Sequence, residues 1–385
     1  MQVLRCVGFE VSSKWEEVQQ DFRIDYVATQ KEIGPIEYAK IHASAFNRSL
    51  IVSEIRHMSK PAISVVVPVY NAGKYLATAI GSIIEQTFDD WEMVCVNDGS
   101  TDGSGEILDW FSSRDPRIRV EHQSNSGVVA AANRGHELAQ AEFVCRMDAD
   151  DIAMPNRLAG QLAYMRSHPD CAAVSGAILE IDSNSEPLGV QRLPLDHESI
   201  VQRLLNRRTG LFQPASMMRA EAFKKIGGFR AKYQWIEDHD LWLRMRQVGQ
   251  LENTEDIVLC YRLHESSCTW SMAELRSDLM SQLMREVNID RGNINVGKEA
   301  ITPPARSDAG PGKWARKAIR GGYPRTAIKH LMRLWKQQGL TWYTVRMFVE
   351  VELRLPSAAS KNLKMESHIR VPNTDRWEEL SLVLK

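Results

Sequence analysis

The feature that most constrains the fold of this chain is a regular alternation of strand-like and helix-like segments that begins at Pro61. Residues 63–67 form a β-branched run between two prolines, which is typical of a strand buried on both faces. Strand-length runs at 91–96, 118–121 and 142–147 alternate with segments whose apolar residues recur three and four positions apart. This alternation predicts βαβ units and therefore an α/β fold, with a mostly parallel sheet flanked by helices.

The alternation continues downstream and divides the chain into three predicted parts. Further helices are expected at 155–168, 196–206, 220–226 and 237–248, and further strands at 172–181, 212–218 and 257–264. We expect an α/β domain over residues 61–271, preceded by a partly helical extension over residues 1–60. Residues 272–385 are expected to form a helical region that is basic from residue 313.

Polar clusters follow three of the predicted strands. Tyr70 and Asn71 follow the first strand, Asp98 follows the second, and residues 148–151 follow the fourth. Sheets of this kind bind ligands beyond the carboxyl ends of their strands. We therefore expect the three clusters to form one site.

The run Asp148-Ala149-Asp150-Asp151 places three carboxylates on one of these loops. Like charges this close repel one another unless a cation lies between them. Proteins usually hold Mg²⁺ or Mn²⁺ with a few such oxygens together with a ligand's phosphates, so we predict a Mn²⁺ or Mg²⁺ site. The alternative is an acidic turn that caps the helix beginning near Pro155.

Composition excludes several classes of protein. The 48 Lys and Arg residues balance 49 Asp and Glu residues, which gives no reason to expect a nucleic-acid partner. No apolar run approaches the roughly 18–20 residues of a membrane-spanning helix, and the first residues show no signal-peptide pattern. Six scattered cysteines without a CxxC motif predict reduced thiols and a cytoplasmic location, rather than a zinc or disulfide framework.

Several motifs, in their order and spacing, resemble the family 2 glycosyltransferases of GT-A fold. They are VVVPVYN at 65–71, VNDGSTD at 96–102, NRG at 133–135, MDADD at 147–151, GGF at 227–229, EDHDLWLR at 237–244 and YRLH at 261–264. The resemblance covers the predicted α/β domain and leaves out the regions on either side of it. It implies an inverting transfer from a nucleotide-diphospho-sugar, with UDP as the favoured nucleotide.

The resemblance also implies a set of binding residues. Tyr70 would lie against the base, and Asp98 would hydrogen-bond it, although Asp98 taken alone reads as a turn or helix-capping residue. The nucleotide-sugar-binding residues implied are Pro68, Val69, Tyr70, Asn71, Asp98, Asn133 and Asp148.

The metal ligands implied by the resemblance are Asp150 and Asp148. Asp150 would ligate the ion that bridges the diphosphate, Asp148 would reach the ribose or the metal, and Asp151 would support them. His264 is a candidate third ligand, weighed against a structural role, which is commoner for a lone histidine at a strand end.

Asp238 matches the position of the family's catalytic base. Inversion needs one carboxylate to take the acceptor hydroxyl's proton as that hydroxyl attacks the anomeric carbon. Glu237 and Asp238 also begin a predicted helix, where acidic residues are stabilised by the helix dipole, and this is the structural alternative. Asp240 and Arg244 are expected to form an i,i+4 ion pair.

The function implied is transfer of a sugar to a hydroxyl of a glycan or lipid-linked acceptor, in cell-surface polysaccharide biosynthesis. Acceptor choice is expected to reside in loops at 182–208 and 228–235. The alternative is a module that binds a nucleotide-sugar without catalysis. A nicotinamide-dependent dehydrogenase would need G-x-G-x-x-G after the first strand, where this chain has Asn71-Ala72-Gly73-Lys74.

The region 313–364 differs from the rest of the chain in charge. It holds twelve basic and two acidic residues, with six aromatic residues interleaved. One interpretation is peripheral attachment to an anionic membrane surface, at the inner face of the membrane. The equal alternative is a helical pair that packs its aromatic residues on the α/β domain or on a second subunit of a homo-oligomer. Gly321, Gly322 and Pro324 are expected to break any helix there.

Overall fold

The computed structural model of the chain describes residues 60–264, 273–290, 310–339, 341–357, 369, 371–377 and 380. The chain divides into two compact units, Met1–Lys60 and Pro61–Lys385. Apart from Lys60, the extension predicted for residues 1–60 lies outside the described residues, and so does the predicted boundary at residue 271. The helices and strands below all belong to the second unit.

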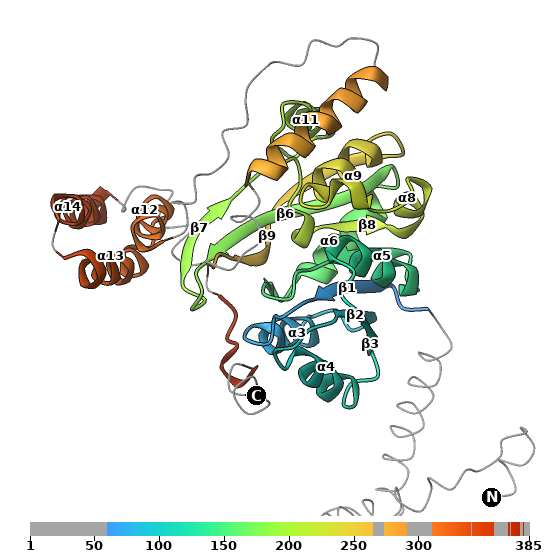
Figure 1. The fold of residues 1–385 in the computed structure, drawn as a ribbon, viewed down its shortest axis with the longest axis horizontal. Helices are drawn as coiled ribbons and strands as arrows, with labels where there is room; N and C mark the ends of the chain where they lie inside the picture. Colours follow the sequence, from blue (N-terminus) through green and yellow to red (C-terminus); the bar gives the residue numbers. More distant parts are fainter. Residues whose placement is uncertain are drawn as a thin grey trace, which may run out of the picture. The chain divides into compact units, whose positions relative to one another are not determined.

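Four parallel strands form the first half of the sheet, in the order β3–β2–β1–β4. Figure 1 labels β1, β2 and β3 of this half. Nearly every residue of β1 and β2 is buried, as expected of apolar strands covered on both faces. The predicted α/β class is confirmed. The elements of this half are β1 (Ile63–Val69), α3 (Leu76–Ile84), β2 (Trp91–Asp98), α4 (Ser104–Ser112), β3 (Ile118–Gln123), α5 (Val128–Leu138) and β4 (Phe143–Arg146).

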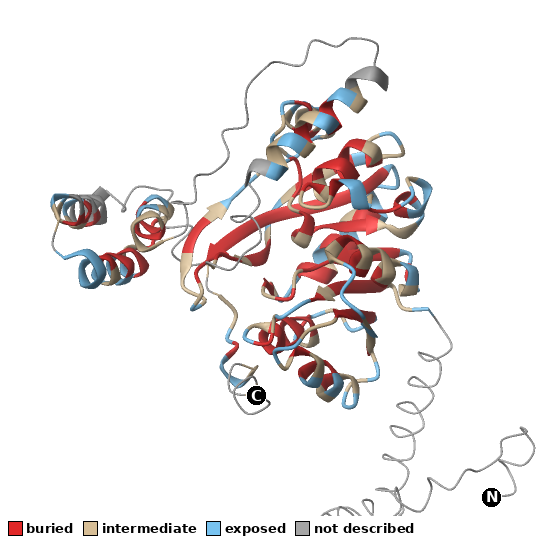
Figure 2. Ribbon diagram, in the orientation of Figure 1, coloured by how far each residue is buried: buried red, intermediate tan, exposed pale blue. Residues whose placement is uncertain are grey.

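The second half of the sheet mixes strand directions. β8 lies between β4 and β6 and is antiparallel to both, whereas β6 and β9 run parallel. β6 is buried along its whole length (Figure 2). The elements are β5 (Ile152–Ala153), α6 (Arg157–Ser167), β6 (Cys171–Ile181), β7 (Pro187–Gln191), α7 (His197–Leu205), β8 (Met217–Arg219), α8 (Ala220–Lys225), α9 (Glu237–Met245), β9 (Gln250–Arg262) and α11 (Ala273–Asp290).

Three sequence predictions in this half need correction. The strand expected at 212–218 is a 3₁₀ turn, Gln213–Ala215, followed by the short strand β8. The strand expected at 257–264 is β9, which begins at Gln250. Its first half pairs with β6 despite shifts in register, so the strand starts earlier than the sequence pattern indicates. The stretch 182–208, predicted as a loop around one helix, also contains the edge strand β7.

The C-terminal helices are α12 (Pro311–Gly321), α13 (Pro324–Gln338) and α14 (Trp342–Ser357). They share a hydrophobic cluster with β6, β7 and β9, which includes Trp314 and Leu331 from the helices and Leu179 and Leu188 from the strands. The predicted break is confirmed, because α12 ends at Gly321, is followed by Gly322 in the left-handed conformation, and α13 begins at Pro324.

Two further expectations concern the thiols and the membrane. The four described cysteines, Cys95, Cys145, Cys171 and Cys260, are buried free thiols. Cys6 and Cys268 lie outside the described residues. None of the described helices combines the length and the hydropathy that crossing a bilayer requires.

Candidate active site

The strand order brings the predicted clusters to one edge of the sheet. β1, β2 and β4 run parallel, so Tyr70, Asp98 and Asp148 come at or just beyond their carboxyl ends. The pairing of β5 with β9 sets Ile152 opposite Cys260, which brings the end of β9 to the acidic loop.

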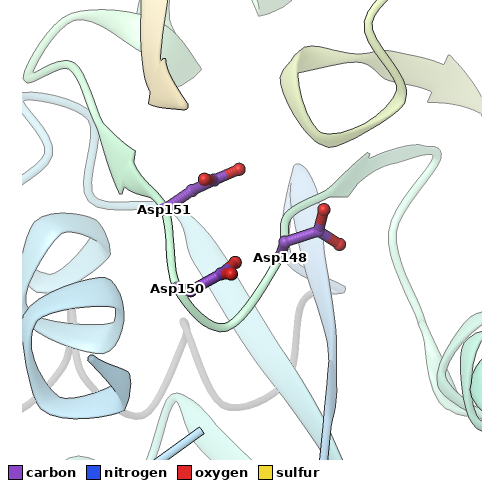
Figure 3. A group of neighbouring side chains, drawn as sticks. All are labelled: Asp148, Asp150 and Asp151. Atoms are coloured by element: carbon purple, nitrogen blue, oxygen red, sulfur yellow. The ribbon is translucent and has the colours of Figure 1, made fainter. Parts of the chain in front are cut away.

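Three carboxylates form the centre of this site. Asp148, Asp150 and Asp151 offer oxygen atoms that all lie within 4.8 Å of one another, and all three sit on the loop between β4 and β5 (Figure 3). Burial raises the pKa of Asp151 well above its ordinary value, and the charges of Asp150 and Asp148 raise it further. One oxygen of Asp151, Oδ2, is buried without a hydrogen-bond partner.

This donor set fits a divalent cation. Closely spaced carboxylates are the ligand type that Mg²⁺ and Mn²⁺ prefer. Burial and, after it, repulsion between the carboxylates raise the pKa values of Asp148 and Asp151, and a bound cation would offset the repulsion. His264 lies next to the cluster, with Nε2 2.7 Å from Oδ2 of Asp150. The structure therefore brings together all four side chains that the sequence nominated as metal ligands or their support.

Two arginines that sequence reasoning missed also lie at the cluster. Arg146 is 3% exposed, and its Nη2 lies 2.9 Å from Oδ1 of Asp148. Arg262 donates its backbone N–H to Oδ1 of Asp151 and its Nε–H to the carbonyl oxygen of Asp150. A charged residue in an apolar strand was the available signal for Arg146, because buried arginine is rare unless it is paired.

The predicted base lies on the first turn of α9. Asp238 is close enough to Asp148 for its negative charge to help raise the pKa of Asp148. Its neighbour Glu237 has a buried oxygen, Oε2, without a partner, and burial together with the charge of Asp238 raises the pKa of Glu237 to about 7.

Asp240 is occupied by ion pairs. It is fully buried and pairs with Arg230 and with Arg244, whose Nη2 lies 2.7 Å from Oδ2 of Asp240. The predicted i,i+4 pair is confirmed. Because both carboxylate oxygens accept hydrogen bonds from arginine, Asp240 is poorly suited to take a proton from a substrate.

The nucleotide-side residues differ in what they can offer a ligand. Tyr70 is 56% exposed and its ring is accessible, whereas Val69 is buried and Pro68 is half-buried within β1. Asn71 has a positive φ of 49° and accepts a hydrogen bond from the backbone N–H of Thr101 through Oδ1. Asn71 therefore holds the loops after β1 and β2 together.

Asp98 and Asn133 are engaged inside the protein. The Asp98 carboxylate accepts hydrogen bonds from the side chain of Gln123 and from the backbone N–H groups of Ser126 and Gly127, which precede α5. Asn133 hydrogen-bonds both the N–H and the carbonyl group of Phe229. Both residues position site loops here, and their contact with a nucleotide stays a prediction.

Comparison with known proteins identifies the family of the chain. The sequence profile described as glycosyl transferase family 2 matches residues 64–227. A Haemophilus influenzae protein described as an uncharacterized glycosyltransferase is 30% identical over 237 residues, covering 59% of this chain and 73% of that protein. The glycosyltransferase GlyG of Streptococcus pneumoniae is 38% identical over 153 residues, covering 38% of this chain and 50% of GlyG.

Two further similarities are more distant. The hyaluronan synthase of Pasteurella multocida is 25% identical over 219 residues, covering 56% of this chain and 22% of the synthase. Among solved structures, residues 1–349 of S. aureus TarS in complex with UDP-GlcNAc align with a TM-score of 0.48 and 18% identity, covering 78% of this chain and 92% of that one. By its profile match and its similarity to the Haemophilus influenzae protein, the chain belongs to glycosyltransferase family 2.

Proposed function

We propose that this glycosyltransferase is metal-dependent and inverting, and that it transfers a sugar from a nucleotide-diphospho-sugar to a hydroxyl of a glycan or lipid-linked acceptor. UDP-sugars are the donors we expect. The observation that supports the proposal is that the charge of Asp238 acts on Asp148, a member of the cluster formed with Asp150 and Asp151. A base and a metal-binding carboxylate group are the two parts that such a transfer requires.

Each residue has a part in the proposed reaction. Asp150 and Asp148, with His264, would hold Mn²⁺ or Mg²⁺, and the ion supplies positive charge that stabilises the leaving diphosphate. Tyr70 offers its exposed ring to the base of the nucleotide. Asp238 accepts the proton of the acceptor hydroxyl as the new glycosidic bond forms and the bond to the diphosphate breaks.

The acceptor is expected to be a polysaccharide or its lipid-linked precursor, in cell-surface polysaccharide biosynthesis. The similarity to a hyaluronan synthase, whose product is a polysaccharide, supports this choice. A non-catalytic nucleotide-sugar-binding module is the alternative. Such a module would have no use for a base, so the joint presence of Asp148, Asp150 and Asp238 favours the enzyme.

The decisive experiment replaces the base. Asp238→Asn is nearly isosteric, so donor binding should persist while transfer falls by roughly 10²–10⁴-fold, the range usual for loss of a general base. Donor binding is measured by calorimetry and transfer by product formation, with Glu237→Gln as the neighbouring control. An unchanged kcat in Asp238→Asn would move the base elsewhere, and a product that retains the donor's anomeric configuration by NMR would exclude the inverting mechanism.

We also propose that the protein contacts a membrane peripherally, at the cytoplasmic face, through the outer side of α13. The structure sorts the aromatic residues of the basic region into two groups. Trp314 and Tyr323 are buried and Phe348 packs against their cluster, as the packing interpretation expects. Trp335 and Trp342 are 42% and 81% exposed. The side chain of Tyr343 lies outside the described set.

The exposed side of α13 supports this proposal. Ile328, Met332 and Trp335 are spaced four and three apart, so they form one stripe on the helix, and all three are exposed. Arg325 and Lys336, also exposed, lie at the two ends of the stripe. Apolar and tryptophan side chains bordered by cations match the chemistry of an anionic lipid surface, where each cation contributes about 1 kcal/mol.

A further inference from the structure

Arg262 connects segments that are distant in sequence around the acidic cluster. The residue is 3% exposed, and its guanidinium group donates through Nε to the carbonyl oxygen of Asp150 at 2.7 Å. Through Nη1 it donates to the carbonyl oxygen of Asp182 and to Oγ of Ser185, at 3.2 and 3.0 Å. The ring of Tyr75 stacks against the guanidinium group, 4.4 Å from ring centre to carbon.

The turn that receives Arg262 connects β6 to β7 and has a constrained shape. The Asp182 carboxylate accepts hydrogen bonds from the backbone N–H groups of Asn184 and Glu186. Ser185 adopts a φ of 61°, a left-handed conformation that a residue other than glycine rarely takes. The turn thus presents the Asp182 carbonyl group and the Ser185 hydroxyl group toward Arg262 at some conformational cost.

The C-terminal helix α13 braces this turn from its other side. Nε2 of the fully buried His330 lies 3.0 Å from Oδ2 of Asp182, and Lys329 pairs with Glu186. Burial acts to raise the pKa of Asp182, but the neighbouring His330 ring and the hydrogen bonds from the turn backbone outweigh it and lower that pKa. Contacts therefore run continuously from α13, through Asp182 and Arg262, to Asp150.

We propose that Arg262 is a positioning residue for Asp150 and Asp151, and that the β6–β7 turn braced by α13 holds it in place. In this arrangement the C-terminal helices set the geometry of the metal-binding loop without touching the metal. The inference rests on the proposed metal dependence. Groups that orient metal ligands in this way typically contribute 10–100-fold to metal affinity.

The test uses Ser185→Gly, because its effects on stability and on metal binding should have opposite signs. Glycine favours the left-handed φ, so the free energy of unfolding should stay equal or rise. Loss of the hydroxyl removes one hydrogen bond to Arg262, so Mn²⁺ affinity should fall, by several-fold, measured on the full chain with Mn²⁺ alone by electron paramagnetic resonance. Arg262→Lys should lower it by roughly 10–100-fold.

The brace is tested at His330 with a matched control. His330→Ala should weaken Mn²⁺ binding, and His330→Gln, which keeps a donor, should restore part of it. Lys317→Gln removes an ion pair between α12 and Glu180 outside this chain of contacts and should leave Mn²⁺ affinity unchanged.

The outcomes separate this inference from the proposed function. Unchanged Mn²⁺ affinity in Ser185→Gly and Arg262→Lys, with wild-type binding intact, would overturn the positioning role. Absence of Mn²⁺ binding by the wild-type protein would instead overturn the proposed metal dependence. If both His330 variants fail to fold by circular dichroism, the Ser185 and Arg262 variants still decide the positioning role.

Discussion

The acidic residues at the edge of the sheet give the site an excess of negative charge. The carboxylates of Asp148, Asp150 and Asp151 lie together, and the charge of Asp238 also acts on Asp148. The buried cations Arg146 and Arg262 offset only part of this charge. An arrangement in which burial and like charges raise carboxyl pKa values is unfavourable for folding, so it persists where function requires it. A divalent cation in the site would stabilise the folded protein as well as the leaving group.

We predict that Asp150→Asn weakens Mn²⁺ binding and removes turnover. The amide keeps the size of the side chain but loses the charge that a hard cation requires. Calorimetry with Mn²⁺ and a donor assay measure the two effects, and wild-type enzyme in excess EDTA should behave like the variant. Full activity of the wild-type protein in EDTA would contradict the prediction.

The raised pKa of Glu237 predicts that the stability of the protein depends on pH. Its pKa is raised from 4.5 to about 7 in the folded protein, so the folded state binds the proton more tightly than the unfolded state does. Below pH 4.5 the raised pKa of Glu237 does not change the free energy of unfolding. Between pH 4.5 and about pH 7 it lowers the free energy of unfolding progressively, by up to about 3 kcal/mol. Above that pH the loss of stability stays constant.

The Glu237→Gln variant checks this sign. Its stability relative to wild type should increase between pH 4.5 and pH 7.5, because glutamine cannot lose a proton. Urea denaturation at several pH values measures the difference. A difference that stays flat over that range would show that Glu237 titrates near its ordinary pKa.

At the scale of elements, the packing of α12 on β7 depends on a residue without a side chain. A Cβ atom at Gly321 would lie 2.3 Å from the carbonyl oxygen of Leu188 and 2.6 Å from Cα of Gly189. Both atoms belong to the backbone, so neither can move away cheaply. The helix can approach the strand this closely only with glycine at that position.

Two glycine substitutions should therefore change stability in opposite directions. Gly321→Ala should lower the free energy of unfolding by about 1–3 kcal/mol, because α12 must shift away from β7. Gly160 lies in α6, where a Cβ atom would meet nothing within 4 Å. Gly160→Ala should therefore raise the free energy of unfolding by about 0.5–1 kcal/mol. Denaturant unfolding compares them, and equal effects would show that α12 does not pack as described.

The local sequence pattern predicts those elements that local interactions determine. The buried strand β1 and the pair Asp240–Arg244 follow from short-range patterns, and both are present. β7 contains a proline and a glycine, so its strand character comes from pairing with β6 rather than from its own residues. The role of Arg262 depends on Asp182 and Ser185, about eighty positions earlier, which no local pattern reveals.

At the scale of the whole molecule, the basic residues of the C-terminal region fall into two groups. One group pairs with acidic residues of the β6–β7 hairpin, and the other, which includes Arg325 and Lys336, is exposed on α13. Lys317 and Lys329 pair with Glu180 and Glu186 of the β6–β7 hairpin, so they hold the region on the sheet. The other exposed side of α13 carries the stripe that contains Met332 and Trp335. The overall count of basic residues in the sequence could not separate these groups.

We predict that the full chain pellets with anionic but not with neutral vesicles, and that salt releases it. Met332→Gln with Trp335→Gln should abolish pelleting, since it removes the apolar stripe without disturbing the buried cluster. Leu195→Gln, at a residue 43% exposed elsewhere on the surface, is the matched control. Equal recovery in the supernatant with both lipids would exclude the membrane surface, and concentration-dependent sedimentation without lipid would indicate a second copy as the partner.

The pairing of β6 with β9 has a consequence for how this protein can be divided or recombined. The family profile ends at residue 227, but β6 lies beside β9, which begins at Gln250. A fragment cut at the profile's edge would leave β6, a strand buried along its whole length, with an open hydrogen-bonding edge, which is a template for aggregation. The segment that the family profile matches is therefore smaller than the segment that can fold, and a chimera joined at residue 227 would have to supply a strand in place of β9.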